Sequence, residues 1–411
     1  MPTPLRKRLH PAVATVALLL ALNLLNYIDR YILAGEVQPI QREFHATDQQ
    51  MGALGTAFFL VYMLAAPATG WLGDRFRRKP LIITGATLWS LATLAAIWIH
   101  SYHTLYLRQA LVGVGEATFG IFAPAVLSDF YPERERNRVL SIFYVAIPVG
   151  AALGYLAGGQ IGSHWNWRTP FLVCALPGFL VAALYAGIGR EPERGASDRI
   201  RPSLSRNTVA GIFSNPAFLT ATFGLAALTF AMGGISWWMP EFLRRSVGMS
   251  LGNASLTVGA STVIDGIAGT LIGGWIAQIW LRRNHRALYL FSMWSVALTL
   301  PWGILLFFGP KSWAVPSLFL AEFFLFLNTG PLNTAIVNSV SAPVRATAIS
   351  INLFCIHAFG DTFSPQIIGA ISDHSNLSIG LGATLVSLVV ASSILWYGAR
   401  FAPPFEEAQL P

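Results

Sequence analysis

The stretch GWLGDRFRRKPL, residues 70–81, places one acid among clustered bases directly after a long apolar run. A related stretch, GWIAQIWLRR, begins at Gly274, 204 positions later, and also follows a long apolar run. Arg138 opens RVLSIFYVAIPVGAALGYLAGG, and Arg345 opens the comparable segment RATAISINLFCIHAFGDTFSPQIIG. Two pairs of similar segments at nearly the same offset predict that the chain is built from two similar halves.

The composition indicates that most of the surface faces something other than water. Of 411 residues, 54% are hydrophobic and only 11% are charged, whereas soluble domains usually carry about 25% charged residues. The chain is also longer than one soluble core usually fills. The two cysteines, Cys174 and Cys355, lie in apolar runs and predict neither a disulfide framework nor a metal site.

Twelve apolar runs are each long enough to cross the hydrocarbon core of a bilayer, which takes roughly 20 residues. Because unpaired backbone groups are not tolerated in lipid, each run is expected to be a helix, and the fold class is an all-α membrane protein. The first run carries Asp29 and Arg30 and is followed by no small-residue cleavage site, so we interpret it as a retained helix rather than a signal peptide. The expected spans are 12–39, 48–72, 80–100, 103–130, 138–162, 170–189, 217–243, 254–280, 287–309, 313–340, 345–371 and 377–401.

The distribution of Lys and Arg predicts that both termini are cytoplasmic. With the N-terminus inside, basic residues on the inner side outnumber those on the outer side roughly four to one, as cytoplasmic loops require. These basic loops face the anionic inner leaflet, which accounts for the net charge of +8 without a nucleic-acid partner. We therefore expect a multi-pass protein of the cytoplasmic membrane, surrounded by the lipid bilayer and acting as a monomer.

A polar segment divides the chain near its middle. Residues 190–216, REPERGASDRIRPSLSRNTVAGIFSNP, combine Pro, Gly, Ser and alternating charge, and we interpret them as a cytoplasmic linker. The predicted organisation is an N-terminal six-helix half at 1–189, this linker, and a C-terminal six-helix half at 217–411. An even number of helices in each half makes the repeats parallel, an arrangement that places the substrate site between the halves near the bilayer midplane.

Several segments resemble a known family. GWLGDRFRRKPL resembles the loop signature of the major facilitator superfamily between helices 2 and 3, although Arg77 stands where many members have Gly. The segments LNLLNYIDRYILAG, LVGVGEAT, SIFYVAIPVGAALGYLAGG, GPLNTAIVNSVSAPVRATA and IHAFGDTFSPQIIGAISD resemble the Spinster family in both halves. The resemblance implies the major facilitator fold and an exporter of lipid-like molecules, with lysophospholipids and sphingosine phosphate among the substrates of eukaryotic members. It also implies proton-linked transport.

Polar and charged side chains inside the first run are candidates for a transport site. Asn23, Asn26, Tyr27 and Arg30 fall within about 100° of one another on a helix, and Asp29 flanks that arc. A lipid-facing charge at the bilayer centre costs at least ~2.5–3.5 kcal/mol, so the arc is expected to face protein or a wet cavity. The alternative is a purely structural polar contact that orients the first helix.

The fourth run contains RQALVGVGEAT, whose glycines permit close helix approach and whose acidic residue is Glu116. Gln109 shares a helix face with Glu116 and occupies the position where the Spinster resemblance implies an Arg. Arg108 is turned about 80° away from Glu116, so the role of that Arg passes to Arg108 or to Arg30, or is lost. Two interpretations of Arg108 stay open, a cavity residue and a side chain that extends to the membrane interface.

In the second half, polar residues are spaced to share faces of two regular helices. Glu322, Thr329 and Asn333 are spaced for one face of the run 313–340. Stripes of this kind either line a cavity or hold helices together by hydrogen bonds. The remaining candidates are His357, Asp361 and Ser364 in the run 345–371, and Asp265 in the run 254–280.

Asp29 and Glu116 are the candidates for proton coupling. Asp29 and Arg30 are sequence neighbours and point about 100° apart on a helix, so we expect Arg30 to pair with Glu116 instead. Asp29 would then be freer to change protonation as its surroundings change. The alternative is that Glu116 titrates while Asp29 stays paired with Arg108.

The loop after the second span predicts a cytoplasmic gate. Asp74 ends that span on the inner side, where a helix beginning near Pro343 presents its N-terminus, and such a contact contributes ~0.3–1 kcal/mol when exposed. The second-half copy has Gln278 at the Asp position, so its contact should be weaker. The candidate gate residues are Gly70, Asp74, Arg75, Arg78, Lys79 and Arg345.

Three classes of function compete. An intramembrane lipid-modifying enzyme would need a nucleophile and base or a metal cluster, and the sequence contains no HExxH and no GxSxG, although His357 with Asp361 keeps this class open. A channel would need a pore ring or filter loops, which no motif indicates. The repeats, the loop signature and the intramembrane charges favour a proton-coupled, alternating-access transporter of an amphipathic lipid-like substrate, without a cofactor. The alternative within this class is a proton-coupled exporter of drugs or other small hydrophobic molecules.

Overall fold

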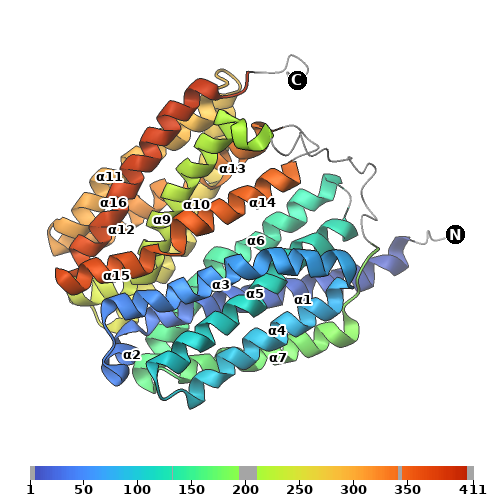
Figure 1. Ribbon diagram of the computed structural model, residues 1–411, viewed down its shortest axis with the longest axis horizontal. Helices are drawn as coiled ribbons and strands as arrows, with labels where there is room; N and C mark the ends of the chain where they lie inside the picture. The colour runs from blue at the N-terminus through green and yellow to red at the C-terminus, as the bar shows by residue number, and fades with distance from the viewer. Residues whose placement is uncertain (1–4, 132, 194–210, 341–344, 405–411) are drawn as a thin grey trace. The chain divides into compact units, whose positions relative to one another are not determined.

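The computed structural model describes residues 5–131, 133–193, 211–340 and 345–404, and its secondary structure in these ranges is helical throughout (Figure 1). The chain divides into two compact units. Unit 1 comprises Met1–Thr47, Ala53–Arg201 and Ser250–Gly259, and unit 2 comprises Asp48–Gly52, Pro202–Met249 and Ala260–Pro411.

The helices of the N-terminal part are long except for one. Apart from its first residues, α3 belongs to unit 1. Ser101 starts α5 because its hydroxyl group accepts a hydrogen bond from the backbone N–H of Thr104. The bounds are α1 Leu5–Ile32, α2 Val37–Phe44, α3 Asp48–Arg75, α4 Arg78–Leu94, α5 Tyr102–Phe130, α6 Glu133–Leu156 and α7 Thr169–Ile188, with the short turns η1 Leu33–Gly35, η2 Ala95–Trp98 and the π-helical η3 Ala157–Gly162.

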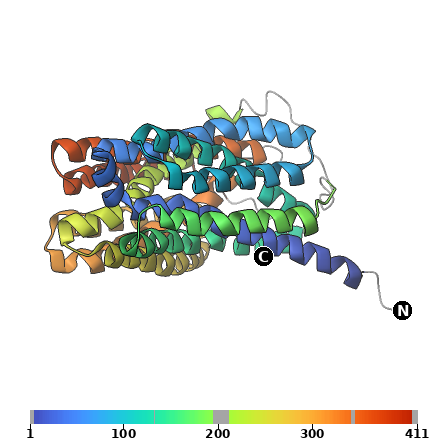
Figure 2. The same cartoon turned by 90° about the horizontal axis from the view of Figure 1, so that it is seen from below.

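The expected first span, 12–39, ends earlier in the structure. After α1 the chain passes through η1, and α2 is a separate helix of eight residues (Figure 2). Pro39 is tolerated in the first turn of α2, where backbone N–H groups lack helical partners in any case. His45 closes α2 with a left-handed backbone conformation, φ 50°.

Two helices of unit 2 start with side-chain caps. Asn215 accepts hydrogen bonds from the N–H groups of Ala217 and Phe218, and Asn376 accepts one from Ile379. One helix, α10 Leu251–Leu281, belongs to unit 1 up to Gly259 and to unit 2 from Ala260. The other bounds are α9 Pro216–Phe242, α11 Ala287–Phe308, α12 Ala314–Phe326, α13 Thr329–Asn338, α14 Arg345–Ile356, α15 Ser364–His374 and α16 Leu377–Gly398, with the short segments η4 Gly211–Ser214, η5 Leu243–Val247, η6 Lys311–Trp313, η8 His357–Asp361 and η9 Ala399–Phe401.

Eleven helices of the described chain are long and apolar enough to cross a membrane. The run 345–371, expected to be one regular helix, is divided into α14, the π-helical η8 and α15. Gly360 has the non-helical dihedrals φ −109° and ψ −106°, and a Cβ there would come 2.8 Å from the carbonyl oxygen of Ala226 on α9. Hydropathy does not report this break, because the interruption serves a close helix contact rather than a change in polarity.

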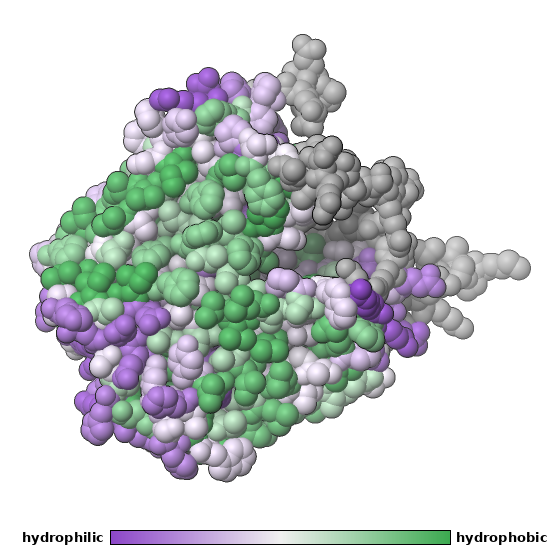
Figure 3. Space-filling view, in the orientation of Figure 1, coloured by the Kyte–Doolittle hydropathy of each residue, from purple (hydrophilic) through white to green (hydrophobic). Residues whose placement is uncertain are grey.

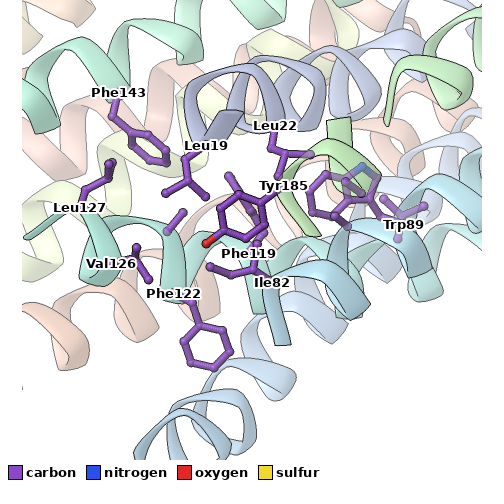
Figure 4. Close-up of a cluster of buried hydrophobic side chains, with 14 of the residues drawn as sticks. Leu19, Leu22, Ile82, Trp89, Phe119, Phe122, Val126, Leu127, Phe143 and Tyr185 are labelled. Atoms are coloured by element: carbon purple, nitrogen blue, oxygen red, sulfur yellow. The ribbon is translucent and has the colours of Figure 1, made fainter. Parts of the chain in front are cut away.

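A hydrophobic core holds the helices of unit 1 together. Figure 4 shows its members from α1, α4, α5, α6 and α7, among them Leu19, Trp89, Phe119 and Tyr185, each with 0% exposure. Trp89 and Phe119 meet edge to face, with ring centroids 5.4 Å apart. Hydrophobic side chains also cover much of the outward surface of the helices in view, as expected for helices in contact with lipid (Figure 3).

The glycines of the fourth run permit close helix approach, as predicted. A Cβ on Gly113 would lie 2.6 Å from the carbonyl oxygen of Phe58 on α3. A Cβ on Gly115 would lie 2.7 Å from the carbonyl oxygen of Gly85 on α4. These two glycines therefore allow α5 to pack closely against α3 and α4. This packing fixes the positions of Arg108, Gln109 and Glu116 in unit 1.

Candidate functional site

An ion pair between α1 and α5 lies within the membrane-spanning part of unit 1. Arg30 Nη2 is 2.8 Å from Glu116 Oε2, and the Glu116 side chain is 0% exposed. Arg30 Nε also donates to Glu116 Oε2, at 3.1 Å. The expected pairing of Arg30 with Glu116 is confirmed.

Aromatic rings surround the guanidinium group of Arg30. Its Cζ lies 4.8 Å from the centroid of Tyr27, 4.9 Å from that of Phe58 and 5.5 Å from that of Tyr62. Cation–π contacts of this kind favour the charged form in a site with little water. Arg30 is thus held from α1 itself, from α3 and from α5.

Asp29 lies on the same helix but in different surroundings. It is 4% exposed, its Oδ2 accepts a hydrogen bond from Thr93 Oγ1 of α4 at 3.1 Å, and its Oδ1 has no partner. It forms no ion pair within the described ranges, so the alternative pairing with Arg108 is not the arrangement in this structure. The carboxyl group is therefore buried with one neutral donor.

Arg108 is buried rather than extended to the membrane interface, with an exposure of 4%. Its Nε donates to the carbonyl oxygen of Ala92 at 2.9 Å, and its Nη1 donates to Gln109 Oε1 at 2.6 Å. Its Cζ lies 4.7 Å from the ring centroid of Phe171 on α7, and its Nη2 has no hydrogen-bond partner. Among the described residues, Arg108 forms no ion pair, although the carboxylates of Asp29 and Glu116 are near enough to interact with its charge.

The two asparagines of α1 are also buried, each with 3% exposure. Asn23 Nδ2 donates to the carbonyl oxygen of Phe143 on α6 at 2.7 Å, a contact between helices. The contact of Asn23 therefore matches the alternative of a purely structural polar contact that orients the first helix. Together with Tyr27, Asp29 and Arg30, these residues turn the polar arc of α1 inward, as the cost of lipid-facing charge requires.

Two of the candidate acids, Glu322 and Asp265, are buried inside unit 2. Glu322 on α12 is 6% exposed and is hydrogen-bonded by Ser261 on α10, which leaves Oε2 without a partner. Asp265, one helical turn after Ser261, is 5% exposed and its Oδ2 has no partner. The stripe expected to join Glu322 with Asn333 is interrupted, because α12 ends at Phe326 and α13 begins at Thr329.

His357 and Asp361 lie at the break between α14 and α15. His357 Nδ1 is 2.9 Å from Asp361 Oδ1, and Ser364 Oγ donates to the carbonyl oxygen of Asp361 at 3.5 Å. The π-helical turn η8 carries both partners, so their pairing does not follow regular α-helical geometry. Asn333, in contrast, is exposed and donates to Thr329 within its own helix.

The expected cytoplasmic gate is only partly described. The side chains of Asp74 and Arg345 lie outside the described residues. Arg75 stacks on Trp71 at 3.8 Å from the ring centroid, and a Cβ on Gly70 would meet nothing within 4 Å. The described contacts therefore leave the proposed contact of Asp74 untested.

Arg78 belongs to an ion-pair group that sequence reasoning missed. Its Nη2 is 2.6 Å from Asp129 Oδ2 at the end of α5, and its Nε is 3.5 Å from Glu191 Oε1. Glu191 also accepts from the backbone N–H groups of Arg78 and Lys79, at 2.7 and 3.1 Å, and so caps the start of α4. The available signal was the mixture of acids and bases in two further segments, SDFYPERER and GREPERG.

A second group that sequence reasoning missed lies in unit 2. Asp48 accepts from Nη1 and Nη2 of Arg245, both at 2.7 Å, and from Ser372 Oγ at 2.6 Å. Asp373 accepts from the backbone N–H of Asp48 at 2.8 Å, and Arg245 also pairs with the buried Glu241. The first turn of α3 is thus held by charged groups of unit 2.

No group of three or more His, Cys, Asp or Glu side chains in the described part of the chain could hold a metal ion. Residues 19–365 match the family described as the Major Facilitator Superfamily. The chain therefore belongs to that superfamily and is an integral, multi-pass membrane transporter rather than an enzyme. Its place within the superfamily comes from curated relatives.

The chain belongs to the Spinster family of these transporters. Protein spinster homolog 1 of Xenopus tropicalis is 33% identical over 389 residues, which cover 88% of this chain and 73% of the relative. The sphingosine-1-phosphate transporter SPNS2 of Danio rerio is 32% identical over 375 residues, which cover 85% of this chain and 74% of the relative. The resemblance seen in the sequence segments of both halves is confirmed.

A solved structure shows the same fold. It is the crystal structure of a bacterial homolog to the human lysosomal transporter Spinster in an inward-facing and unoccupied conformation. The TM-score is 0.84 at 22% sequence identity, and the match covers 95% of this chain and 98% of the other. At this identity the likeness extends to the fold.

Proposed function

We propose that this protein is a proton-coupled transporter of single-chain, amphipathic lipids with a phosphate-bearing head group, of the lysophospholipid or sphingosine-phosphate kind. The observation that carries the proposal is the buried Arg108, whose Nη2 lacks a hydrogen-bond partner and which forms no ion pair among the described residues. A buried cation of this kind is unfavourable unless an anion compensates it during the transport cycle. A relative named as a sphingosine-1-phosphate transporter supports a lipid phosphate as that anion.

The head group would lie on the polar faces of α1 and α5. A phosphate oxygen could accept a hydrogen bond from the unpartnered Nη2 of Arg108, because guanidinium N–H groups form strong, charge-assisted bonds to phosphate. The acyl or sphingoid chain would extend along apolar helix walls. Sugars and amino acids offer no comparable apolar tail.

Proton coupling would rest on Asp29, with Glu116 setting the electrostatic field around it. Glu116 is compensated by Arg30, whereas Asp29 has one neutral donor and no cation at ion-pair distance. A carboxyl group in such surroundings changes protonation more easily than a paired one when the helices rearrange. Proton binding at Asp29 and substrate binding near Arg108 would then alternate.

The same proposal includes the full topology. Residues 345–374 would form a twelfth span across the break at Gly360, giving two six-helix halves at 1–189 and 217–411, joined by the linker 190–216. Both termini would be cytoplasmic, and the protein would act as a monomer by alternating access. Asp74, oriented by Arg75, Arg78 and Arg345, would hold the inner gate shut, and Asp74→Asn should favour the inward-open form in spin-label distances across that gate.

The substrate is tested with purified protein in liposomes. Saturable uptake of lysophosphatidylcholine or sphingosine phosphate is expected, with at least a tenfold loss in Arg108→Ala. Arg77→Ala is the matched control, because the Arg77 side chain is 82% exposed. Uptake of sugars or amino acids with none of single-chain lipids would overturn the proposal, and formation of a modified lipid would indicate an enzyme instead.

A further inference from the structure

Glu36 is a buried carboxyl group that the proposed transport site does not use. It follows the candidate span Val13–Gly35 and directly precedes α2. Its exposed fraction is 0%, and neither Oε1 nor Oε2 has a hydrogen-bond partner. The side chain lies against the π-helical turn η3, where a Cβ on Gly162 would overlap the carboxyl oxygen Oε1. The missing side chain at Gly162 provides the space that this carboxyl group fills.

Glycines bring the surrounding backbone together. A Cβ on Gly35 in η1 would lie 3.0 Å from the backbone nitrogen of Gly159 and 3.2 Å from Cα of Gly158, both in η3. A Cβ on Gly158 would in turn lie 2.5 Å from the carbonyl oxygen of Ile32. We call this contact of η1 with η3 the glycine seam, and it encloses Glu36 within unit 1.

Burial decides the charge of Glu36. Burial alone raises the pKa of this carboxyl group to about 9. No charged or titratable side chain adds to this effect from the elements that enclose Glu36. The titratable side chains near this site on those elements and their ends include Arg30, Tyr31, Arg42, Glu43, His45, Tyr155, His164, Arg168 and Cys174.

Several of these side chains are engaged elsewhere. Arg30 is paired with Glu116, and Glu43 is paired with Arg168. His164 is exposed, and its Nδ1 lies 2.7 Å from the carbonyl oxygen of Gln160. An ionised Glu36 would therefore have neither water nor a counter-ion at the closed seam.

We propose that Glu36 is a proton-binding site of unit 1, separate from Asp29 and Glu116, which holds its proton while the glycine seam is closed and releases it to water when the seam opens. The carboxylate left behind lies at the N-terminus of α2, where free backbone N–H groups favour negative charge. Proton release and seam opening are linked, so a rise in pH shifts the population toward the open form. The site requires no assumption about the transported substrate.

Infrared difference spectroscopy of the full-length protein in lipid tests the site directly. Between about pH 6 and about pH 11, the wild type should lose a protonated-carboxyl band with a midpoint near about 9. Glu36→Gln should lack this band, and Glu43→Gln, which removes an ion-paired carboxylate of the neighbouring helix, should retain it. Asp29→Asn and Glu116→Gln should also retain this band. A negative result for Glu36 can therefore be distinguished from a failure of the proposed transport mechanism.

A distance measurement tests the link to the seam. Spin labels at Arg42→Cys and Ser163→Cys, in a background without Cys174 and Cys355, report the separation of α2 from the end of η3. The distance should lengthen above about pH 9 in the wild type and stay short in Glu36→Gln. Glu36→Met provides the same test with an apolar side chain if the amide variant fails to fold. An unchanged wild-type band, or the same change of distance with and without Glu36, would overturn the inference.

Discussion

Arg30 and Glu116 form an ion pair in which two donors of one guanidinium group, Nε and Nη2, converge on a single carboxylate oxygen, Oε2. Glu116 has 0% side-chain exposure and Arg30 has 15%, so little water compensates either charge. Removing one partner of such a pair leaves an uncompensated buried charge, whereas removing both need not destabilise the protein. This asymmetry allows the pair to be tested independently of transport.

The first prediction concerns the stability of the pair. Arg30→Met should lower the free energy of unfolding by about 3–5 kcal/mol, because Glu116 is then buried without a cation. The double variant Arg30→Met/Glu116→Leu should regain most of that loss while transport stays abolished. Thermal and denaturant unfolding in detergent measure the unfolding free energies of the wild type, the two single variants and the double variant. Losses that simply add in the double variant would show that the two side chains do not depend on each other.

The second prediction concerns proton coupling. Asp29→Asn should abolish the pH dependence of uptake while substrate binding remains measurable, because the amide cannot change its protonation. Glu116→Gln should weaken transport through its partner Arg30 but keep a pH dependence. Initial rates in liposomes with an imposed proton gradient separate the two. The assignment of Asp29 is wrong if pH dependence persists in Asp29→Asn and disappears in Glu116→Gln.

The third prediction concerns the start of α4. Glu191→Ala removes the acceptor for the backbone N–H groups of Arg78 and Lys79 and one of the two acids beside Arg78. We expect a loss of about 1–2 kcal/mol in unfolding free energy, the usual cost of a lost cap. Arg77→Ala should change stability by less than about 0.5 kcal/mol, since exposed ion pairs contribute little. Equal effects of the two substitutions would contradict the capping role.

The pairing of Arg30 with Glu116 could be predicted because helix geometry excludes a good contact between neighbours Asp29 and Arg30. The superfamily and the Spinster family could likewise be predicted, because their segments are contiguous in sequence. In contrast, the ion pairs of Arg78 join residues 51 and 113 positions apart. Nothing local in the sequence indicates which acids of separate segments meet one base.

The breaks in the helices were not predictable from hydropathy. α12 and α13 are separated at Asn328, and α14 and α15 are separated at Gly360, within runs that stay apolar. Their causes are contacts made in the folded unit, such as that of Gly360 with α9. Glu36 was missed for the same reason, because its burial depends on Gly162, far along the chain.

The fourth prediction concerns pH and the contact between α2 and the start of α7. Hydrogen bonding from Arg168, with a smaller contribution from Trp167, lowers the pKa of Glu43 below its usual value of 4.5. A carboxyl group whose pKa is lowered by folding stabilises the fold at pH values above its pKa in the unfolded state. This stabilisation is lost as the pH falls through the pKa in the folded state. Glu43→Gln should therefore lower the Tm near pH 7 and have little effect near pH 3.

The size of that effect is limited by solvent. The Glu43 side chain is 37% exposed, so we expect about 1 kcal/mol or less at neutral pH. Unfolding scans of wild type and Glu43→Gln across this pH range provide the measurement. A difference in Tm that stays constant from neutral to acid pH would mean that packing, rather than charge, is lost.

The last prediction concerns the close approach of α5 to α3. At Gly113 an added Cβ would lie 2.6 Å from the carbonyl oxygen of Phe58. Because this oxygen is a backbone atom, the clash can be relieved only if a helix moves. Gly113→Ala should therefore destabilise unit 1 by about 1–3 kcal/mol through overpacking. It should also displace Glu116, one turn further along α5, and reduce transport.

Gly187→Ala is the matched control, because a Cβ at Gly187 would meet nothing within 4 Å, and alanine favours the helix. If Gly113→Ala unfolds at the same temperature as Gly187→Ala, the close contact of α5 with α3 does not hold this part of unit 1 in place.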